Sequence, residues 1–592
     1  MQTIGTAEIA RPGNGRLRLV VFTAGSLAPI NRVFFERLVR DPLLDVAAIV
    51  VDEYQRRRKP PVERIVRAVR EDGVSWFAFK LVSTLDSLVR RVALRLFERV
   101  HRSPQSEESY EALALRAGVR VHRVPDIHRD ESLELIRSLQ PQLGVIVGGR
   151  ILRDTVITIP DYGTLNIHKR KVPEYRGGGP VGYWEILAGE PSIGVTIHYA
   201  ATQVDAGLVL AEATIPIEAC DTLESLQIKA DLRGAQLYHE TLRRFAQGVR
   251  QGVPQDTSRG RTYRAPSDFK VWRLGRRLKR KAVAAMPLLR VRPSWPVRLR
   301  VLGQYVVVLP LLLAVKKRLV RDHRAPICVL FYHVVANYPL NHMCLPLEAF
   351  VRHVEFLCRY YTVMSLDDAV ERLRSGKNDQ IAAAITFDDG YRDNVWAIEY
   401  LRYFGIPASF FVSIGHIRDG CAFEHDRRRG FDGAAPMSEE QLRRLVADGF
   451  IVGSHGIHHE DFGALRPATA DRVLRESREL IREACGHAPV HFSFPKGQRG
   501  TNITEESFDL ATKHYPYVFS AYGGYCLPRV GRRHFLRVGH PIDELELAML
   551  MDGYTGLRQC LFGNAWGLKT EALAPYSAEL GPRAGAGSGS LS

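Results

Sequence analysis

The chain has 592 residues, enough for three or four domains, and its 45% hydrophobic and 25% charged content is that of ordinary globular protein. Its eight Cys show no CxxC pair and no regular spacing, which favours reduced thiols in a cytosolic protein and argues against a disulfide framework. The net charge is +17, and residues 259–324 contain 19 Lys or Arg against two Asp, a local excess equal to that of the whole chain, so this segment is expected to be a tether or docking surface.

The N-terminal part of the chain alternates strand and helix patterns. Residues 1–15 lack an apolar core of signal-peptide length and are expected to be flexible. Helical patterns are expected between Gly25 and Arg40 and over 132–139. Short apolar runs predict strands at 16–24, 46–51, 119–124, 143–147 and 164–167. This alternation predicts an α/β domain over 16–258, with a Rossmann-like, doubly wound parallel sheet.

Residues 54–103 interrupt this alternation with 12 Lys or Arg between Arg56 and Arg99 and several interleaved aromatic residues. We expect a basic amphipathic helical insertion here. The alternative is a solvated helix pair that packs on its own domain.

The basic segment 259–324 contains an apolar run at 301–315 with basic residues on both sides. Fifteen residues that include Gln304 and Pro310 are short for a transmembrane helix. A segment in a membrane interface, held by basic residues on anionic lipid, fits better, and a buried helix between domains is the equal alternative. Nucleic-acid binding is the third option and ranks last, because few aromatic residues interleave the basic cluster at 273–281.

Strand and helix patterns alternate again in the C-terminal half, which is expected to form a domain over 325–560. The patterns fall at 328–332, 347–360, 366–373 and 382–387. The tail at 561–592 ends in Gly-Ser-rich sequence and is expected to be flexible.

Asn166 and His168 lie two residues apart on a predicted strand, so their side chains share one face. An amide donor beside an imidazole suits acyl transfer to an amine, because one group steadies the tetrahedral oxyanion while the other handles the proton. Asp205, from a later Val-Asp-Ala-Gly segment, is a carboxylate that could orient and polarise this His. Taken singly, a His at a strand end is more often structural.

The ordered set is more specific than its parts. With the Tyr-Arg-Gly-Gly-Gly-Pro segment at 175–180, Trp184 and the Gly-Val-Thr-Ile-His segment at 194–198, it closely resembles the N10-formyltetrahydrofolate-dependent formyltransferase family over about residues 16–248. The resemblance implies that formyl passes from 10-formyltetrahydrofolate to a primary amine. It implies that the catalytic residues are Asn166, His168 and Asp205. It also assigns to the cofactor-binding strand end Gly149, Arg150, Ile151 and Leu152.

Two departures from the family pattern lie where the acceptor should bind: the basic run 169–171 after the His, and Glu185 after Trp184. The second domain of the methionyl-tRNA enzyme is not evident either, since the basic segment occupies its place. Together these points favour a sugar amine as acceptor over methionyl-tRNA.

Asp388 and Asp389 follow the apolar run at 382–387. Each carboxylate raises the cost of ionising the other unless a cation or a proton-transfer role separates their duties. His455 and His459 follow about 65 residues later, and an Asp with a His-x3-His pair supplies three ligands in the open arrangement of a catalytic metal site. His458 is the competing ligand.

Five ordered motifs resemble the polysaccharide deacetylase family, which includes rhizobial chitooligosaccharide deacetylases, over about residues 326–540. They include Phe-Tyr-His ending at His333, the Asp-Asp and His-x3-His segments, and Phe-Pro-Lys-Gly at 494–497. The resemblance implies a distorted (β/α) barrel. It implies a divalent metal, Zn by expectation, held by Asp389, His455 and His459, with Asp388 as general base. The proton donor to the leaving amine is either His540 or another residue, and Ser493 stands where the family often has Arg.

We therefore expect a bifunctional enzyme of amino-sugar metabolism. One half would formylate a sugar amine and the other would hydrolyse an N-acetyl or N-formyl amide, in either order. The expected substrate is an amino sugar or sugar nucleotide, which a lipid carrier could hold, and the expected place is the cytoplasm, with peripheral contact to the inner membrane face through 259–324. The alternatives are a methionyl-tRNA-type formyltransferase fused to a deacetylase, and a catalytically dead scaffold of a polysaccharide assembly complex.

Overall fold

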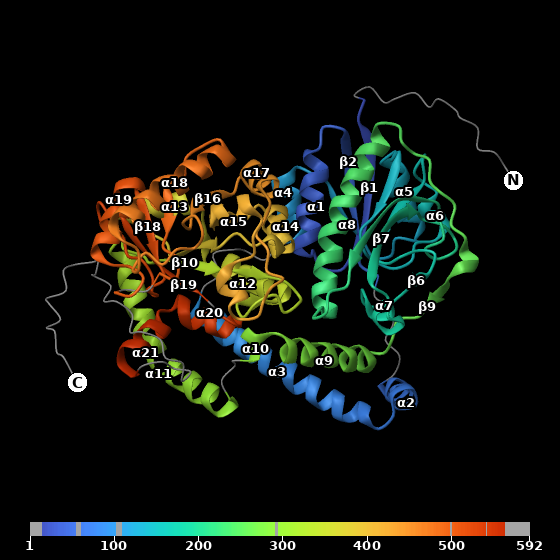
Figure 1. The fold of residues 1–592 in the computed structure, drawn as a ribbon. Coiled ribbons are helices and arrows are strands. Elements are labelled where there is room, and N and C mark those ends of the chain that lie inside the picture. Colours follow the sequence, from blue (N-terminus) through green and yellow to red (C-terminus); the bar gives the residue numbers. More distant parts are fainter. Residues whose placement is uncertain are drawn as a thin grey trace. The chain divides into compact units, whose positions relative to one another are not determined.

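The computed structural model describes residues 15–54, 61–101, 109–290, 294–497, 500–539 and 541–562. The chain divides into two compact units (Figure 1). Unit 1 comprises the described residues of Met1–Phe97 and Ser106–Arg280, and unit 2 those of Glu98–Gln105 and Lys281–Ser592. The ends expected to be flexible lie almost entirely outside the described residues.

Unit 1 is built on a seven-stranded sheet with the strand order β3-β2-β1-β4-β5-β7-β8. Its first five strands are parallel, and β7 and β8 continue the sheet antiparallel. This confirms the predicted doubly wound parallel sheet and adds an antiparallel edge. The strands are β1 (Leu17–Ala24), β2 (Leu44–Asp52), β3 (Val121–Val124), β4 (Leu143–Ile146), β5 (Thr164–His168), β7 (Ser192–Tyr199) and β8 (Val209–Pro216).

Helices cover both faces of this sheet (Figure 1). On one face, α1 (Pro29–Arg40) and α8 (Leu223–Ala246) pack together, with the rings of Phe34 and Tyr238 5.5 Å apart. On the other, α5 (Asp130–Ser138) and α6 (Asp154–Ile157) bury apolar side chains against Val20 and Phe22 of β1. Successive residues of a strand point to opposite faces, so a strand buried on both sides is apolar on both, as β1 is from Leu19 to Phe22.

The remaining elements of unit 1 lie between and after these. The expected helical insertion forms α2 and α3, and Phe79 of α3 packs against Phe269 and Trp272 of α9, with ring centroids 5.6 and 5.1 Å away. The elements are α2 (Pro61–Asp72), α3 (Ser75–Val100), α4 (Tyr110–Ala117), β6 (Tyr175–Gly177), α7 (Tyr183–Ala188), β9 (Arg261–Tyr263) and α9 (Asp268–Ala285).

Unit 2 is a closed barrel of seven parallel strands in the order β10-β19-β18-β17-β16-β15-β14, closed by the pairing of β10 with β14. This confirms the predicted (β/α) barrel. A short strand, β13 (Thr362–Val363), adds to the outside of β14. The barrel strands are β10 (Ile327–Tyr332), β14 (Ala382–Phe387), β15 (Ser409–Val412), β16 (Ile451–Ser454), β17 (His491–Ser493), β18 (Tyr517–Ser520) and β19 (His534–Gly539).

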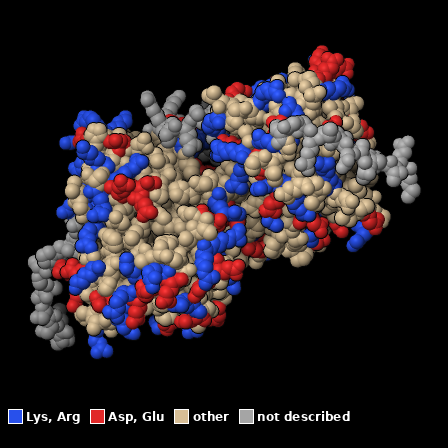
Figure 2. Space-filling view, turned by 90° about the horizontal axis from the view of Figure 1, so that it is seen from above, with Lys and Arg blue, Asp and Glu red and all other residues tan. Residues whose placement is uncertain are grey.

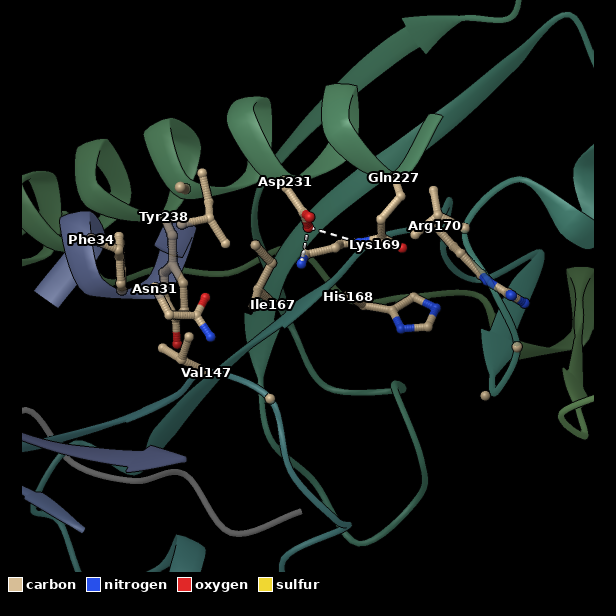
Figure 3. A pocket seen from close by; sticks show the side chains of 16 residues that line it. Asn31, Phe34, Val147, Ile167, His168, Lys169, Arg170, Gln227, Asp231 and Tyr238 are labelled. Carbon is tan, nitrogen blue, oxygen red and sulfur yellow. Dashed lines mark hydrogen bonds and ion pairs between the residues drawn. The ribbon is translucent and has the colours of Figure 1, made fainter. Parts of the chain in front are cut away.

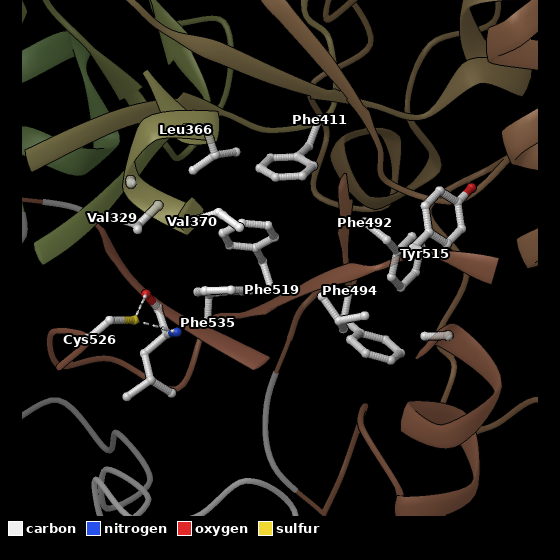
Figure 4. Close-up of a cluster of buried hydrophobic side chains, with 14 of the residues drawn as sticks. Val329, Leu366, Val370, Phe411, Phe492, Phe494, Tyr515, Phe519, Cys526 and Phe535 are labelled. Carbon is white, nitrogen blue, oxygen red and sulfur yellow. Dashed lines mark hydrogen bonds between the residues drawn. The ribbon is translucent and has the colours of Figure 1, made fainter. Parts of the chain in front are cut away.

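Aromatic side chains fill much of the barrel core (Figure 4). Phe519 lies 5.3 Å from Phe411 and 5.1 Å from Phe535, measured between ring centroids, and Phe492 stacks on Tyr515. Aromatic pairs at these separations add to the hydrophobic stabilisation of a core. The strands are thereby fixed, and so are the positions of the side chains at their carboxyl ends.

Helices surround the barrel strands in chain order. They are α12 (Leu347–Tyr360), α13 (Leu366–Ser375), α14 (Val395–Phe404), α15 (Ile414–Asp419), α16 (Glu424–Arg427), α17 (Glu439–Ala447), α18 (Pro467–Cys485), α19 (Glu505–His514), α20 (Glu544–Met551) and α21 (Tyr554–Phe562). Before the barrel come α10 (Pro287–Arg290) and α11 (Trp295–Arg321), and a small pair, β11 (Val334–Val335) and β12 (Cys344–Leu345), follows β10. The seven cysteines whose side chains the structure describes form no disulfide.

Within the described part of the chain, α11 alone is long and apolar enough to cross a membrane by length and composition. Figure 2 shows the molecule from above, and on this face small groups of Lys and Arg lie among groups of Asp and Glu. The excess of positive charge in the sequence therefore does not appear as one large basic patch on that face.

Candidate active sites

The predicted trio of unit 1 comes together at the end of β5. Asn166 and His168 lie on that strand, and Asp205 lies in the loop between β7 and β8 with a left-handed backbone (φ 51°). Asn166 Nδ2 donates to Asp205 Oδ1 at 3.4 Å, and His168 Nδ1 lies 3.4 Å from Asp205 Oδ2. The backbone N–H of Gly177 also donates to Asp205, at 2.9 Å. The loop carboxylate thus joins the two strand residues.

A second histidine, His198, belongs to this cluster. It is paired with Asn166 across β5 and β7, and its Nε2 lies 3.3 Å from Asn166 Nδ2 and 3.5 Å from Asp205 Oδ1. The sequence motif contained His198, but nothing in its spacing assigned it a role. Its position follows from the antiparallel register of β7, which single-sequence patterns do not specify.

Burial lowers the pKa of His168, although the charge of Asp205 acts in the opposite direction. Burial alone would raise the pKa of Asp205, but its hydrogen bond with His198 and the charge of His168 bring that pKa below its ordinary value. The site therefore pairs a neutral imidazole with an ionised carboxylate at neutral pH. Because His168 Nε2 lies 2.8 Å from the Tyr175 carbonyl, both ring nitrogens face oxygen acceptors and can hold a proton.

A cavity of about 290 Å³ opens beside His168 (Figure 3). One side is apolar, with Phe34 and Tyr238, and the other is polar, with Lys169 paired to Asp231. Gln227 donates to the same Asp231 oxygen at 2.8 Å. The cavity can hold a small polar molecule with an apolar side, as ligand sites in proteins generally do.

The segment predicted to bind the cofactor follows β4. Gly148 lines the cavity, and Gly149 has φ 123°, which favours glycine. The Arg150 guanidinium is held by Asp52 (2.6 Å) and Asp126. Ile151 is exposed, and Leu152 packs against the core beside α5 and α6. The binding roles of 149–152 stay predictions, and the Arg150 side chain is already engaged within the protein.

Of the two departures from the family pattern, Arg170 in the basic run and Glu185 are buried, whereas Lys169 and Lys171 are partly exposed. Arg170 donates to the Pro180 carbonyl at 2.8 Å. Glu185 is fully buried, and neither of its oxygens has a hydrogen-bond partner among the described residues. Burial raises the pKa of Glu185.

The three predicted metal ligands of unit 2 also come together. Asp389 follows β14, and His455 and His459 follow β16, so all three lie at the carboxyl ends of barrel strands. Asp389 Oδ1 is 3.6 Å from His455 Nε2 and 3.4 Å from His459 Nε2, and ligand atoms of the three lie within 4.8 Å of one another. His455 Nδ1 faces the Ser493 carbonyl at 2.8 Å, which directs Nε2 towards the other two ligands.

These residues fit a divalent cation. Asp389 is fully buried, and neither of its oxygens has a hydrogen-bond partner in the described part of the chain. The nearby Tyr391 hydroxyl donates instead to Asp426, at 2.7 Å. Burial and the neighbouring Asp388 raise the pKa of Asp389 well above its ordinary value, and burial lowers that of His459. A cation would compensate the buried carboxylate, and neutral imidazoles are the form that binds metal.

Asp388 has a different environment from Asp389. Arg537 of β19 donates to it from both terminal nitrogens, Nη1 to Oδ1 at 2.6 Å and Nη2 to Oδ2 at 2.8 Å. Arg537 Nη2 also donates to Ser493 Oγ at 2.5 Å. Burial alone would raise the pKa of Asp388, but the charge of Arg537 lowers it to about 2. The Arg that the family often has at position 493 is thus supplied from β19, and Ser493 accepts a hydrogen bond from it.

Two further histidines lie near this centre, and sequence reasoning assigned neither a role. His333 follows β10, next to β14 in the barrel, and its charge acts on the pKa of both Asp388 and His459. His425 of α16 lies 3.8 Å from Asp389 Oδ2, with its ring centroid 4.6 Å from that of His459. The Phe-Tyr-His motif was a signal for His333. Nothing in the sequence indicated His425.

Two histidines named in the sequence analysis do not join the metal centre among the described residues. His458 is half-exposed and its Nε2 lies 2.9 Å from Asp419, so its side chain is engaged away from the centre. His540, the predicted proton donor, lies outside the described residues.

Asp389 and His459 both have a left-handed backbone, with φ 70° and 60°. Non-glycine residues in that conformation are strained and concentrate at functional sites.

Family comparisons match both halves of the chain. A formyl transferase family model matches residues 103–242, and a polysaccharide deacetylase family model matches residues 375–514. Methionyl-tRNA formyltransferase of Trichlorobacter lovleyi is 39% identical over 131 residues, which are 22% of this chain and 41% of that protein. The chain therefore spans less than half the length of the curated relatives it matches.

Solved structures resemble each half at low identity. Streptococcus pyogenes deacetylase PplD, in complex with acetate, is 16% identical, with a TM-score of 0.33 over 38% of this chain and 99% of that one. Glycinamide ribonucleotide transformylase 1 from Symbiobacterium toebii is 18% identical, with a TM-score of 0.28 over 43% of this chain and all of that one. The family matches span both residue clusters: the chain joins a formyltransferase domain and a polysaccharide deacetylase domain in one polypeptide.

Proposed function

We propose that the chain is a bifunctional enzyme of amino-sugar metabolism. Unit 1 would transfer formyl from 10-formyltetrahydrofolate to a sugar amine, and unit 2 would hydrolyse an N-acyl amide on a carbohydrate with a divalent metal, Zn by expectation. The observation that supports this best is the presence of two complete polar clusters, the Asn166–His168–Asp205 trio and the Asp389–His455–His459 centre, in one chain.

In unit 1 the amine nitrogen attacks the formyl carbon, and a new C–N bond forms. Asn166 Nδ2 is the donor placed to stabilise the oxyanion that develops on the formyl oxygen. His168 is neutral and takes the proton that the amine loses, while Asp205 stabilises the charged ring. The bond to the folate nitrogen then breaks, and that nitrogen takes up a proton. The cavity beside His168, with Asp231 and Gln227, would hold the acceptor.

In unit 2 a water oxygen attacks the amide carbon, and Asp388 accepts the proton that the water loses. Arg537 keeps Asp388 ionised and fixes both of its oxygens. When bound, a divalent cation supplies Lewis-acid polarisation of the amide carbonyl. The C–N bond then breaks, and we assign His333 to protonate the departing amine, because it follows β10 beside β14 and its charge acts on the pKa of Asp388 and His459. His540, which the family resemblance suggests, is the alternative.

The test uses the full chain with 10-formyltetrahydrofolate and either an amino or an N-acetyl sugar nucleotide, with products identified by mass. An N-formyl product from the amino sugar supports the formyltransferase, and a free amine from the N-acetyl sugar supports the deacylase. His168→Ala should abolish only the first product and Asp388→Asn only the second. If no N-formyl sugar forms with the wild-type chain, the sugar acceptor is wrong.

Methionyl-tRNA is the second acceptor to be tested, because the curated relatives matched by unit 1 carry the name methionyl-tRNA formyltransferase. Charged initiator tRNA replaces the sugar in the same assay. Formyl-methionyl-tRNA as the preferred product would replace the sugar proposal. Catalysis by neither unit would support the scaffold alternative. Against it stands the buried Asp389, whose oxygens have no hydrogen-bond partner among the described residues.

A further inference from the structure

Helix α11 has one face fixed to unit 2. Val301 and Tyr305 are buried against Met549 and Tyr554 of α20 and α21, and Arg298 pairs with Asp543 at 2.5 Å. The buried residues recur every three or four positions, as expected for one side of a helix. The helix is therefore held along its length by the barrel unit.

The polar groups of this fixed face converge on one buried carboxylate. Asp552 Oδ2 accepts from the Tyr305 hydroxyl at 2.5 Å, and Asp552 Oδ1 accepts from Lys316 Nζ at 2.7 Å. His101 Nε2 lies 3.0 Å from the same Oδ1. A buried ion pair with additional hydrogen bonds is costly to break, because each partner would be left as an uncompensated charge. This network resists removal of α11 from unit 2.

The opposite side of α11, which we call the outer face, is apolar and exposed. Its large side chains are between 44% and 79% exposed, and they are Trp295, Leu299, Val306, Val307, Leu311 and Val315. A large exposed apolar face is rare on soluble proteins, and where it occurs it generally marks a site that binds another surface.

Exposed basic residues lie within the outer face and after its C-terminal end. Asp322 is the only acidic residue between 294 and 324. The exposed basic side chains are Arg300, Lys317, Arg318, Arg321 and Arg324. An apolar face with one exposed Arg within it and four basic residues after it complements the surface of an anionic bilayer, where the apolar side chains enter the headgroup region and the basic ones remain near lipid phosphates.

A cavity of about 350 Å³ lies between α11 and α21 and is almost entirely apolar, with Val307, Val308 and Leu557 in its lining. Arg300 and Arg558 also line it. Arg558 is only 6% exposed, and its Nε has no hydrogen-bond partner among the described residues. An apolar cavity lined by two guanidinium groups matches the tail and the charged headgroup of an anionic phospholipid.

We infer that the outer face of α11 docks unit 2 on an anionic phospholipid bilayer, with the helix lying in the plane of the membrane. The apolar run 301–315 is only about 22 Å long at 1.5 Å per residue, against a hydrocarbon core of about 30 Å. The paired Arg298 and Lys316 lie on both sides of this run. If α11 lies in the plane of the membrane, Arg298 and Lys316 keep their pairs with Asp543 and Asp552. If α11 spanned the membrane, it would have to detach from the rest of unit 2.

The test is flotation of the full chain with vesicles of phosphatidylcholine alone or mixed with phosphatidylglycerol, at low and high salt. Wild-type protein should float with the mixed vesicles at low salt and lose most binding at high salt, because salt screens the basic residues. The double variant Val307→Glu, Leu311→Glu should weaken binding by roughly tenfold or more, since it places charge in the buried side of the contact. The matched control is Leu115→Glu with Val530→Glu, which changes exposed apolar residues elsewhere and should bind as wild type does.

Circular dichroism checks that both double variants fold. Three outcomes would overturn the proposal. The first is undiminished vesicle binding by the Val307→Glu, Leu311→Glu variant. The second is resistance of the membrane-bound chain to alkaline carbonate extraction, which would show a spanning helix. The third is a dimer by light scattering that this variant dissociates, which would show that a second copy covers the outer face.

Discussion

At the scale of single residues, Arg537 is the positioning residue on which deacylation by unit 2 should depend most. It acts through Asp388 and does not itself touch the substrate. Its bidentate contact fixes both oxygens of Asp388. Arg537→Lys keeps the charge but cannot donate in that geometry. We expect kcat for amide hydrolysis to fall by roughly a hundredfold, while zinc content by elemental analysis stays unchanged.

Ser493→Ala is the matched control, because it removes one hydrogen bond to Arg537 and leaves the pair with Asp388 intact. Its kcat should change far less. If Arg537→Lys retained wild-type kcat, the contact with Asp388 would be structural only.

The proton donor gives a second residue-scale prediction. His333→Gln should lower kcat for amide hydrolysis by roughly a hundredfold or more, because a general acid typically contributes that much. The effect should shrink for substrates whose leaving amine is a weak base and needs less protonation. An equal loss for all leaving groups would assign the role to another residue, and His540→Gln in the same assay would show whether it is that one.

Sequence reasoning found residues whose spacing is itself informative. The adjacent pair Asp388-Asp389 and the His-x3-His pair indicated one centre, and the structure brings Asp389 and the two histidines within ligand distance. Arg537 could not be found in this way. It lies 149 residues from Asp388 in the sequence but close to it in space, because only β10 lies between β19 and β14 in the closed barrel. Strand order is not visible in a local sequence pattern.

At the scale of elements, the network around Asp552 makes the attachment of α11 depend on pH. Burial alone would raise the pKa of Asp552, but its hydrogen bond with His101 and the charge of Lys316 lower it to about 2. A carboxyl with a lowered pKa stabilises the fold above its unfolded pKa, near 3.8, and this contribution is lost as pH falls from there towards 2. The shift corresponds to about 2 kcal/mol.

Asp552→Asn should therefore lower the free energy of unfolding by a few kcal/mol at neutral pH, because it also leaves Lys316 buried without its counter-charge. Urea unfolding of both proteins between pH 7 and pH 3 measures the difference, which should narrow in the acid part of that range. A difference that did not change with pH would mean that Asp552 is not ionised in the folded protein.

The fold was predictable at this scale where patterns are strong. The helix at 347–360 and the strand at 382–387 coincide with α12 and β14 because amphipathic period and apolar run are both clear there. The antiparallel edge of unit 1 was not foreseen. An apolar strand such as β7 reads the same in either direction, and only its partner β5 sets its orientation.

At the scale of the whole molecule, two compact units with separate cores should unfold in more than one step. Zinc binds only the folded form of unit 2 under our proposal, so it should raise the temperature of one transition in calorimetry and leave the other in place. At a hundredfold excess over its dissociation constant, a ligand adds about 2.7 kcal/mol to stability.

Asp389→Ala should remove this response while both transitions remain. A shift of both transitions by zinc, or a shift that persists in the variant, would contradict the assignment of the metal to Asp389 and its two histidines.

The contact of His101 with Asp552 also sets an order for biosynthesis. The two residues are 451 positions apart, and His101 belongs to a short stretch that joins unit 2 although unit 1 surrounds it in the sequence. A ribosome adding about 5 to 20 residues per second needs on the order of 20 to 90 s to reach the partner. Throughout that interval His101 has no Asp552 to pair with, so this early segment can take its place in unit 2 only after the late one has been made. A fragment that begins at residue 281 would contain every barrel strand but would lack His101 and its contact with Asp552.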